Sequence, residues 1–131
     1  MNIARNNEIL KTIIDQDGIL RLILNNQHNH NALSEEMMSN IQAALEESIS
    51  NKKIRVVIIS AEGPTFSAGH DLKELTNGRQ DPDKGKNYFE TVMKKCSKLK
   101  SLILEWSLTL YSKHLEHLRM EFVIITVMMN M

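Results

Sequence analysis

The sequence has a single cysteine, Cys96, among its 131 residues. One cysteine cannot form an internal disulfide or a cysteine-rich zinc site, and it fits a reducing compartment. Glycine is also scarce: there are five, none follows Gly85, and no two have the spacing of a dinucleotide-binding or P-loop motif. The composition therefore argues against disulfide-rich folds and against the common nucleotide-binding motifs.

Net charge and long apolar runs are lacking as well. Sixteen basic and sixteen acidic side chains cancel, so no overall field attracts nucleic acid or an anionic membrane. No apolar run approaches the ~18 residues of a membrane-spanning helix. The N-terminal stretch MNIARNNEILK has no apolar signal core. We therefore expect a cytoplasmic protein with one domain and with neither a nucleic acid nor a membrane as partner.

The first half of the chain predicts mixed α and β structure. Two apolar runs, Ile9–Ile14 and Ile19–Leu24, flank an Asp-Gly turn and predict a hairpin. Ser34 is a candidate N-cap for a helix, and the uninterrupted β-branched run from Val56 to Ile59 predicts a strand buried on both faces. The order is therefore β-β-α-β. The buried stripe of the helix comprises Met37, Ile41, Ala44, Leu45 and Ile49.

The second half is less regular. The polar segment 76–86 predicts a mobile surface loop, and a second helix is expected from Asp83 or Asn87 to Leu99. Residues 102–110 alternate as in a strand, although a continuing helix fits them too, and 122–129 form another apolar, β-favouring run. We expect Cys96 to be an inert core thiol with no His placed to activate it. The apolar stripe of this second helix comprises Phe89, Val92, Met93, Cys96 and Leu99.

One stretch carries the strongest functional signal: 56–75, VVIISAEGPTFSAGHDLKEL. A strand is followed by a Gly-Pro turn, by small residues, and by Asp71 at the start of a short helix. Such a junction leaves backbone N–H groups unpaired, and these suit an anion or a carbonyl oxygen that becomes an oxyanion. The alternative is purely structural: Gly69 forms a tight turn and Asp71 is an N-cap.

The string SAEGPTFSAGHDLKEL resembles the signature of the enoyl-CoA hydratase/isomerase (crotonase) superfamily. The resemblance runs from Ile9 to Ile103, and the His after the glycine matches one branch most closely. It implies an α/β fold, a partial and truncated crotonase-like ββα spiral. Residues 1–103 would form the N-terminal part of the domain, and 104–131 a tail without resemblance. The implied substrate is an acyl-CoA thioester, with coenzyme A as part of the substrate and no separate cofactor.

The resemblance also implies site residues. The backbone N–H of His70 would be one oxyanion donor. His30 stands just before the helix-entry string NALS, where relatives often carry Lys or Arg near the CoA phosphates. No metal site is expected, because His114 and His117 lack a third ligand. The backbone expected near the adenine end of CoA is that of Ser67, Ala68, Gly69, Asp71 and Leu72.

One departure from the family pattern concerns activity. The second oxyanion donor in the family comes from a glycine-rich turn after the helix expected to end near Leu99, and the catalytic carboxylates lie in and beyond that turn. The absence of glycine after Gly85 therefore predicts impaired catalysis. The alternatives are a non-catalytic remnant that binds acyl-CoA or a partner, and a non-functional truncation product. The apolar runs 102–110 and 122–129 would expose apolar surface unless another chain buries it, so we expect a homo-oligomer or aggregation.

Overall fold

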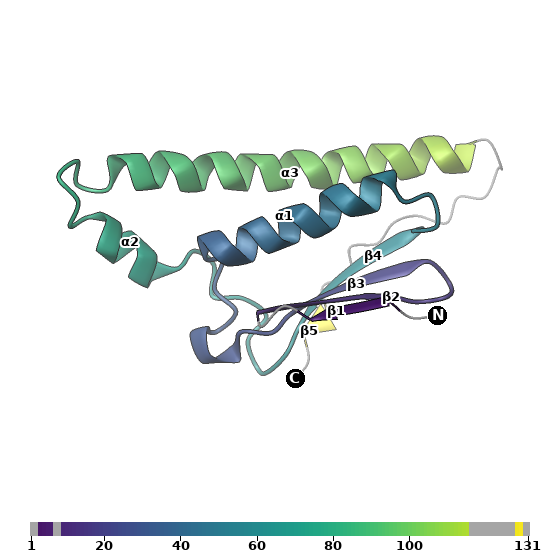
Figure 1. Ribbon diagram of the computed structural model, residues 1–131, viewed down its shortest axis with the longest axis horizontal. Coiled ribbons are helices and arrows are strands. Elements are labelled where there is room, and N and C mark those ends of the chain that lie inside the picture. Colours follow the sequence, from purple (N-terminus) through teal and green to yellow (C-terminus); the bar gives the residue numbers. More distant parts are fainter. Residues whose placement is uncertain (1–2, 7–8, 116–127, 130–131) are drawn as a thin grey trace.

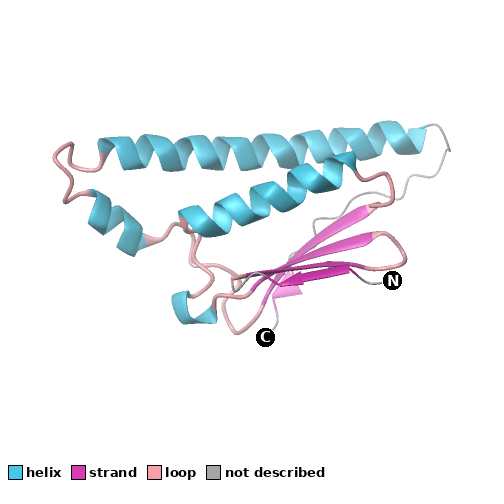
Figure 2. Ribbon diagram, in the orientation of Figure 1, coloured by secondary structure: helices cyan, strands magenta, loops and turns pink. Residues whose placement is uncertain are grey.

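The computed structural model describes residues 3–6, 9–115 and 128–129. They form a sheet with helix α1 packed on one face, and helix α3 runs alongside α1 on the side away from the sheet (Figure 1). The shorter helix α2 lies at one end of these layers (Figure 2). In chain order the elements are β1 (Ile3–Asn6), β2 (Leu10–Ile14), β3 (Ile19–Leu24), the 3₁₀ turn η1 (Gln27–Asn29), α1 (Glu35–Ser50), β4 (Val56–Ala61), α2 (Leu72–Gly78), α3 (Lys86–Leu115) and β5 (Met128–Met129).

The sheet has the strand order β1-β2-β3-β4-β5. The first three strands are antiparallel, whereas β4 is parallel to β3 and β5 is parallel to β4. In the β2–β3 turn, the Asp15 carboxylate accepts the N–H groups of Asp17 and Ile19, at 2.9 and 3.0 Å. The predicted hairpin and the β-β-α-β order are confirmed, and β1 is an additional strand that the sequence analysis did not anticipate.

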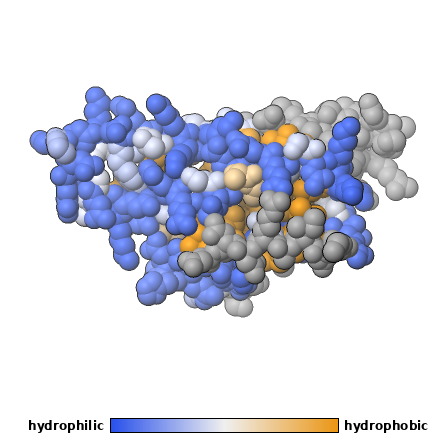
Figure 3. All heavy atoms as spheres, in the orientation of Figure 1, coloured by the Kyte–Doolittle hydropathy of each residue, from blue (hydrophilic) through white to orange (hydrophobic). Residues whose placement is uncertain are grey.

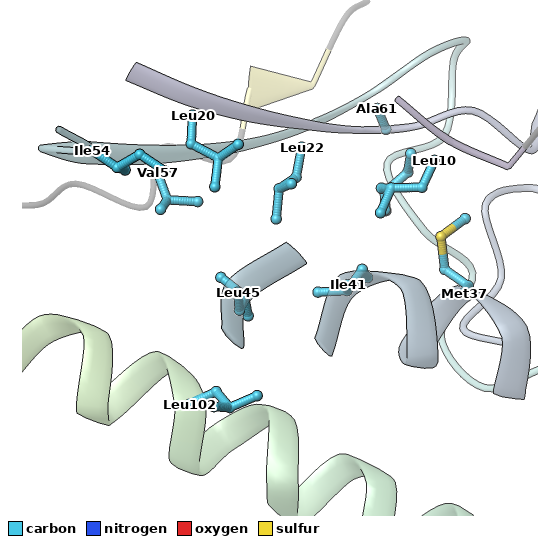
Figure 4. Close-up of a cluster of buried hydrophobic side chains, with 11 residues drawn as sticks. Leu10, Leu20, Leu22, Met37, Ile41, Leu45, Ile54, Val57, Ala61 and Leu102 are labelled. Atoms are coloured by element: carbon cyan, nitrogen blue, oxygen red, sulfur yellow. The ribbon is translucent and has the colours of Figure 1, made fainter. Parts of the chain in front are cut away.

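The hydrophobic core lies between the sheet and α1. Strand β3 alternates strictly, with Leu20, Leu22 and Leu24 buried on the side that faces the helix. The stripe predicted for α1 is confirmed: Met37, Ile41 and Leu45 are buried, and Ala44 and Ile49 pack partly buried against them. Figure 4 shows Leu20 and Leu22 of the sheet pointing toward Ile41 and Leu45 of α1, and Leu102 of α3 belongs to the same cluster.

Strand β4 differs from its prediction. Val57 and Ala61 are buried, whereas Val56, Ile58 and Ile59 are partly exposed. The expectation of burial on both faces is therefore wrong for the described part of the chain. The physical reason is that α1 covers one face of the sheet, so alternate residues of the strand lie outside the core.

Helix α3 is longer than the sequence suggested. It runs without interruption to Leu115, so its expected end near Leu99 is wrong, and of the two alternatives for 102–110 the continuing helix is confirmed. Helical spacing carries Val92, Leu99 and Leu102 onto the packed side of the helix. The expected division at residue 103 stays a prediction, and α3 continues across that position. None of the described helices combines the length and hydrophobicity that crossing a bilayer requires.

The segment 76–86 is more ordered than a surface loop. Thr76–Gly78 belong to α2, and turns with backbone hydrogen bonds connect α2 to α3. The Asp83 carboxylate accepts the N–H groups of Gly85 and Asn87 at the start of α3. Within the apolar run 122–129, residues 122–127 lie outside the described residues, and Met128–Met129 pair with Ser60 and Ala61 of β4.

Candidate functional site

The turn after β4 lies against the loop that precedes α1. The Leu33 N–H donates to the Gly69 carbonyl at 2.6 Å, and the Ala68 N–H donates to the His30 carbonyl at 3.0 Å. Gly69 has φ +83°, a conformation that glycine adopts without strain. These two backbone bonds place His30 beside the segment 67–72, so the structure brings the sequence-predicted site residues together.

Asn31 ties the two loops to each other. Its side chain is 1% exposed and makes three hydrogen bonds. Its Oδ1 accepts the Asn26 N–H at 2.7 Å, and its Nδ2 donates to the carbonyls of Glu62 and Thr65 at 2.9 and 2.8 Å. Buried polar groups are normally satisfied in this way. Asn31 therefore fixes the turn that carries the candidate site, a role that the sequence analysis missed.

The Asp71 side chain is used within the fold. It is 7% exposed; one oxygen accepts the N–H groups of Lys73 and Glu74, and the other accepts Nδ2 of Asn29 at 2.8 Å. Burial acts to raise the pKa of Asp71, but the bonds from Asn29 and from the two N–H groups outweigh it and hold the pKa below its usual value. The N-cap assignment is thereby confirmed, so a contact between Asp71 and a ligand would involve its main chain.

The backbone N–H groups of the turn differ in whether they have a hydrogen-bond acceptor. The N–H groups of Ala68 and Gly69 are taken, the latter by Oγ of Ser67 at 3.1 Å. The His70 N–H has no acceptor within the part of the chain that the structure describes, and His70 is exposed. A Cβ built on Gly69 would meet no atom within 4 Å. The turn therefore combines an unpaired donor with open space at the neighbouring Gly69, and an oxygen atom that binds there would need both.

The imidazole of His70 lies beside Cys96 of α3. Nε2 is 4.0 Å from Sγ, and the thiol also donates to Sδ of Met38 at 3.6 Å. A His is therefore within reach of the thiol, contrary to the expectation that none is placed to activate it, whereas the inertness of Cys96 stays a prediction. Residues 70 and 96 are far apart in sequence, and they meet because α3 packs over α1 and α2. Among the described residues, no group of three or more His, Cys, Asp or Glu side chains could hold a metal ion.

Glu74 joins the three helices. Its carboxylate accepts the Glu35 N–H in the first turn of α1, at 3.1 Å, and the Tyr88 hydroxyl of α3, at 2.8 Å. Burial, followed by the hydrogen bond to Glu74, raises the pKa of Tyr88 well above 10. Glu74 therefore fixes α2, and with it the turn that ends at His70. Nothing in the sequence distinguishes this residue from the other surface carboxylates.

Comparison with known proteins identifies the family. The profile of the enoyl-CoA hydratase/isomerase family matches residues 15–104. Mitochondrial enoyl-CoA hydratase domain-containing protein 3 of Mus musculus is 41% identical over 88 residues, which are 67% of this chain and 28% of that protein. Its human counterpart is 42% identical over 83 residues, 63% of this chain and 26% of that protein. These relatives belong to the branch that the His after the glycine had indicated.

Solved structures agree with this assignment. The crystal structure of human enoyl-CoA hydratase domain-containing protein 3 matches with a TM-score of 0.56 and 36% identity, over 75% of this chain and 33% of that one. An enoyl-CoA hydratase of Mycobacterium smegmatis matches with a TM-score of 0.66 and 32% identity, over 74% of this chain and 36% of that one. The match thus spans about a third of these relatives. The chain belongs to the enoyl-CoA hydratase/isomerase family, and its fold is part of the crotonase fold.

Proposed function

We propose that the chain binds acyl-CoA thioesters and that the thioester carbonyl oxygen accepts a hydrogen bond from the His70 N–H. The observation that carries this proposal is the unpaired N–H at an exposed turn beside Gly69, where no described atom would meet a Cβ. A donor aimed at developing negative charge contributes about 3 kcal/mol to catalysis in well-studied acyl-transfer enzymes. Membership of the enoyl-CoA hydratase/isomerase family supports the choice of a thioester as ligand.

The CoA portion would lie against the same turn. We place its adenine end on the main chain of residues 67–72, where Ser67 and Ala68 have small side chains, and its phosphates near His30. Support comes from the bond between the Ala68 N–H and the His30 carbonyl, because it holds both parts of the proposed contact surface together. A His in place of a Lys or Arg would make the phosphate contact depend on pH.

We further propose that this chain, by itself, hydrates enoyl thioesters slowly. The second donor and the carboxylates of the family pattern are expected after the helix that follows the motif. In this chain that helix is α3, which continues to Leu115 without a glycine-rich turn. Loss of one oxyanion donor alone lowers the rate of such reactions about 10²–10³-fold, and loss of an acid or base lowers it about 10²–10⁴-fold.

The test is titration calorimetry with crotonyl-CoA and free CoA on the wild-type chain and on two variants. His70→Pro removes the N–H, whereas His70→Ala removes the imidazole and keeps the N–H. We expect saturable binding of crotonyl-CoA that His70→Ala retains and His70→Pro weakens, with both variants folded by circular dichroism. Equal binding by both variants would refute the role of the N–H. No binding by the folded wild-type chain would refute the function altogether. A hydration assay on the same samples tests the slow turnover.

A further inference from the structure

A cavity of about 380 Å³ opens between the end of α2 and the start of α3. Small-molecule pockets are usually about 300–1,000 Å³, so this cavity suits one end of a ligand rather than a whole CoA ester. Lys84 and Gly85, in the connection between the two helices, contribute to its lining. The lining residues are Leu75, Arg79, Lys84, Gly85, Lys86, Tyr88 and Phe89.

The lining of the cavity is cationic. It includes Arg79, Lys84 and Lys86 and no carboxylate, and within the described residues none of these three cations forms an ion pair. The nearby Asp83 carboxylate accepts two N–H groups at the start of α3, and these bonds together with the charge of Lys86 hold the pKa of Asp83 below its usual value. The N-terminal end of that 30-residue helix adds positive potential. This end of the molecule is hydrophilic on the face seen in Figure 3. The cavity therefore suits an anionic group.

An apolar face of α3 leads from the cavity to the candidate site. Phe89, Met93 and Cys96 are spaced four and three residues apart, so they share one side of the helix. Phe89 lines the cavity, and Cys96 lies 4.0 Å from the His70 ring. Phe89 and Met93 are 56% and 44% exposed. Their predicted burial in the apolar stripe of the helix is therefore wrong, and the exposed side chains are available to a ligand.

Helix α2 and its C-cap carry a second row of residues, two of which line the cavity. Leu72, Leu75 and Arg79 are spaced three and four residues apart; the first is 72% exposed, and the other two line the cavity. Leu72, Phe89 and Met93 are the exposed large hydrophobic side chains of the described residues. Leu72 lies two residues after His70, and Leu75 and Phe89 both line the cavity, so together with Met93 these side chains offer an apolar track between His70 and the cations.

The length of the track sets the size of the ligand. Seven residue steps separate Leu72, the first residue of α2, from its C-cap Arg79, which at 1.5 Å per helical residue is about 10 Å. Seven steps separate Cys96 from Phe89, or about 10 Å. Because tetrahedral carbons zigzag, an extended chain with C–C bonds of about 1.5 Å advances only about 1.25 Å per bond, so roughly eight to ten carbons cover this distance.

We propose that the preferred acyl group ends in a carboxylate: the ligand is the CoA monothioester of a dicarboxylic acid of roughly eight to ten carbons. This inference rests on the proposed function, since the thioester would be held at the His70 N–H. The methylenes lie along the apolar track, and the distal carboxylate lies among Arg79, Lys84 and Lys86. A guanidinium can bind a carboxylate through two parallel hydrogen bonds, and the charges attract the same group at longer range.

The test compares two ligands of equal length, octanoyl-CoA and octanedioyl-CoA, by titration calorimetry on the full chain. The wild type should bind octanedioyl-CoA roughly tenfold more tightly, the effect of one charge-assisted hydrogen bond. The triple variant Arg79→Gln, Lys84→Gln, Lys86→Gln should lose this preference and keep its affinity for octanoyl-CoA. The matched control Lys52→Gln, Lys53→Gln removes two exposed lysines beyond the far end of α1 and should keep the preference.

Each outcome separates this inference from the proposed function. Binding of both ligands with equal affinity by the wild type would overturn the carboxylate preference and leave the thioester site intact. A preference that persists in the folded triple variant would overturn the role of the cavity. Failure of the folded wild type to bind either ligand would overturn both proposals. The comparison within the wild type is decisive even if the triple variant fails to fold.

Discussion

The substitution Asn31→Ala tests how the candidate site is held in place. It removes the three side-chain hydrogen bonds that join the loop before α1 to the turn after β4. The bonds are short, at 2.7–2.9 Å, and the residue is 1% exposed, so water cannot replace them without opening the structure. The three groups bonded by Asn31 would be left unsatisfied.

The magnitude follows from two contributions. Each lost bond costs about 1 kcal/mol, which gives about 3 kcal/mol in total. Asn31 also has φ +52°, a left-handed conformation that Asn tolerates and Ala adopts at a cost of about 1 kcal/mol. We therefore expect Asn31→Ala to lower the free energy of unfolding by about 4 kcal/mol. Asn31→Gly loses the same bonds without the backbone strain, so it should lose about 3 kcal/mol.

The assay is urea denaturation followed by circular dichroism, with the slope of the transition compared between variants. Asn51→Ala is the matched control, because the Asn51 side chain accepts one exposed bond, from the Lys53 N–H, and its loss should cost about 1 kcal/mol or less. The reasoning is refuted if Asn31→Ala costs no more than Asn51→Ala. It is also refuted in part if Asn31→Gly is no more stable than Asn31→Ala, since the backbone contribution would then be absent.

Three further predictions concern the same region. Gly69→Ala should cost about 1–2 kcal/mol, from backbone strain alone, whereas Gly18→Ala should cost more in the same denaturation assay, because its Cβ would also collide with a backbone carbonyl. The folded pKa of Asp71 is lowered, so its contribution to stability is complete above the unfolded pKa of 3.8 and is lost as the pH falls through the folded value. In Asp71→Asn, the free energy of unfolding should therefore fall less steeply as the pH is lowered in the acid range. An unchanged acid dependence would show that Asp71 does not cause it. Tyr88→Phe removes the bond to Glu74 and should lower the free energy of unfolding by about 1.5–3 kcal/mol. The phenol that ionises at the highest pH in an ultraviolet titration should vanish in this variant, and its persistence would contradict the raised pKa of Tyr88.

The sequence by itself determined the local elements of this protein. The hairpin followed from two apolar runs around an Asp-Gly turn, because turn chemistry and side-chain period act over a few residues. The stripe of α1 and the Ser34 N-cap followed from helical spacing, and the Ser34 hydroxyl accepts the Met37 N–H. The motif SAEGPTFSAGHDLKEL identified the family, which the comparisons confirmed.

Tertiary structure decided which residues meet. The run 102–110 alternates like a strand, yet it is helical, because Leu102 completes the core on the packed side of α3. The pairing of Cys96 with His70 joins residues that sequence spacing cannot relate. The same is true of the bonds from Asn31 to Glu62 and Thr65.

Exposure was likewise decided by packing. Phe89 and Met93 share the helical rhythm of Val92, but Val92 is buried and the other two are not, because α1 covers one side of α3. The three cations of the cavity come from the C-cap of α2, the loop that follows it and the first residue of α3, and only the turn from α2 into α3 places them together. Periodicity shows which side chains share a face, whereas the neighbouring elements determine whether that face is covered or left open to a ligand.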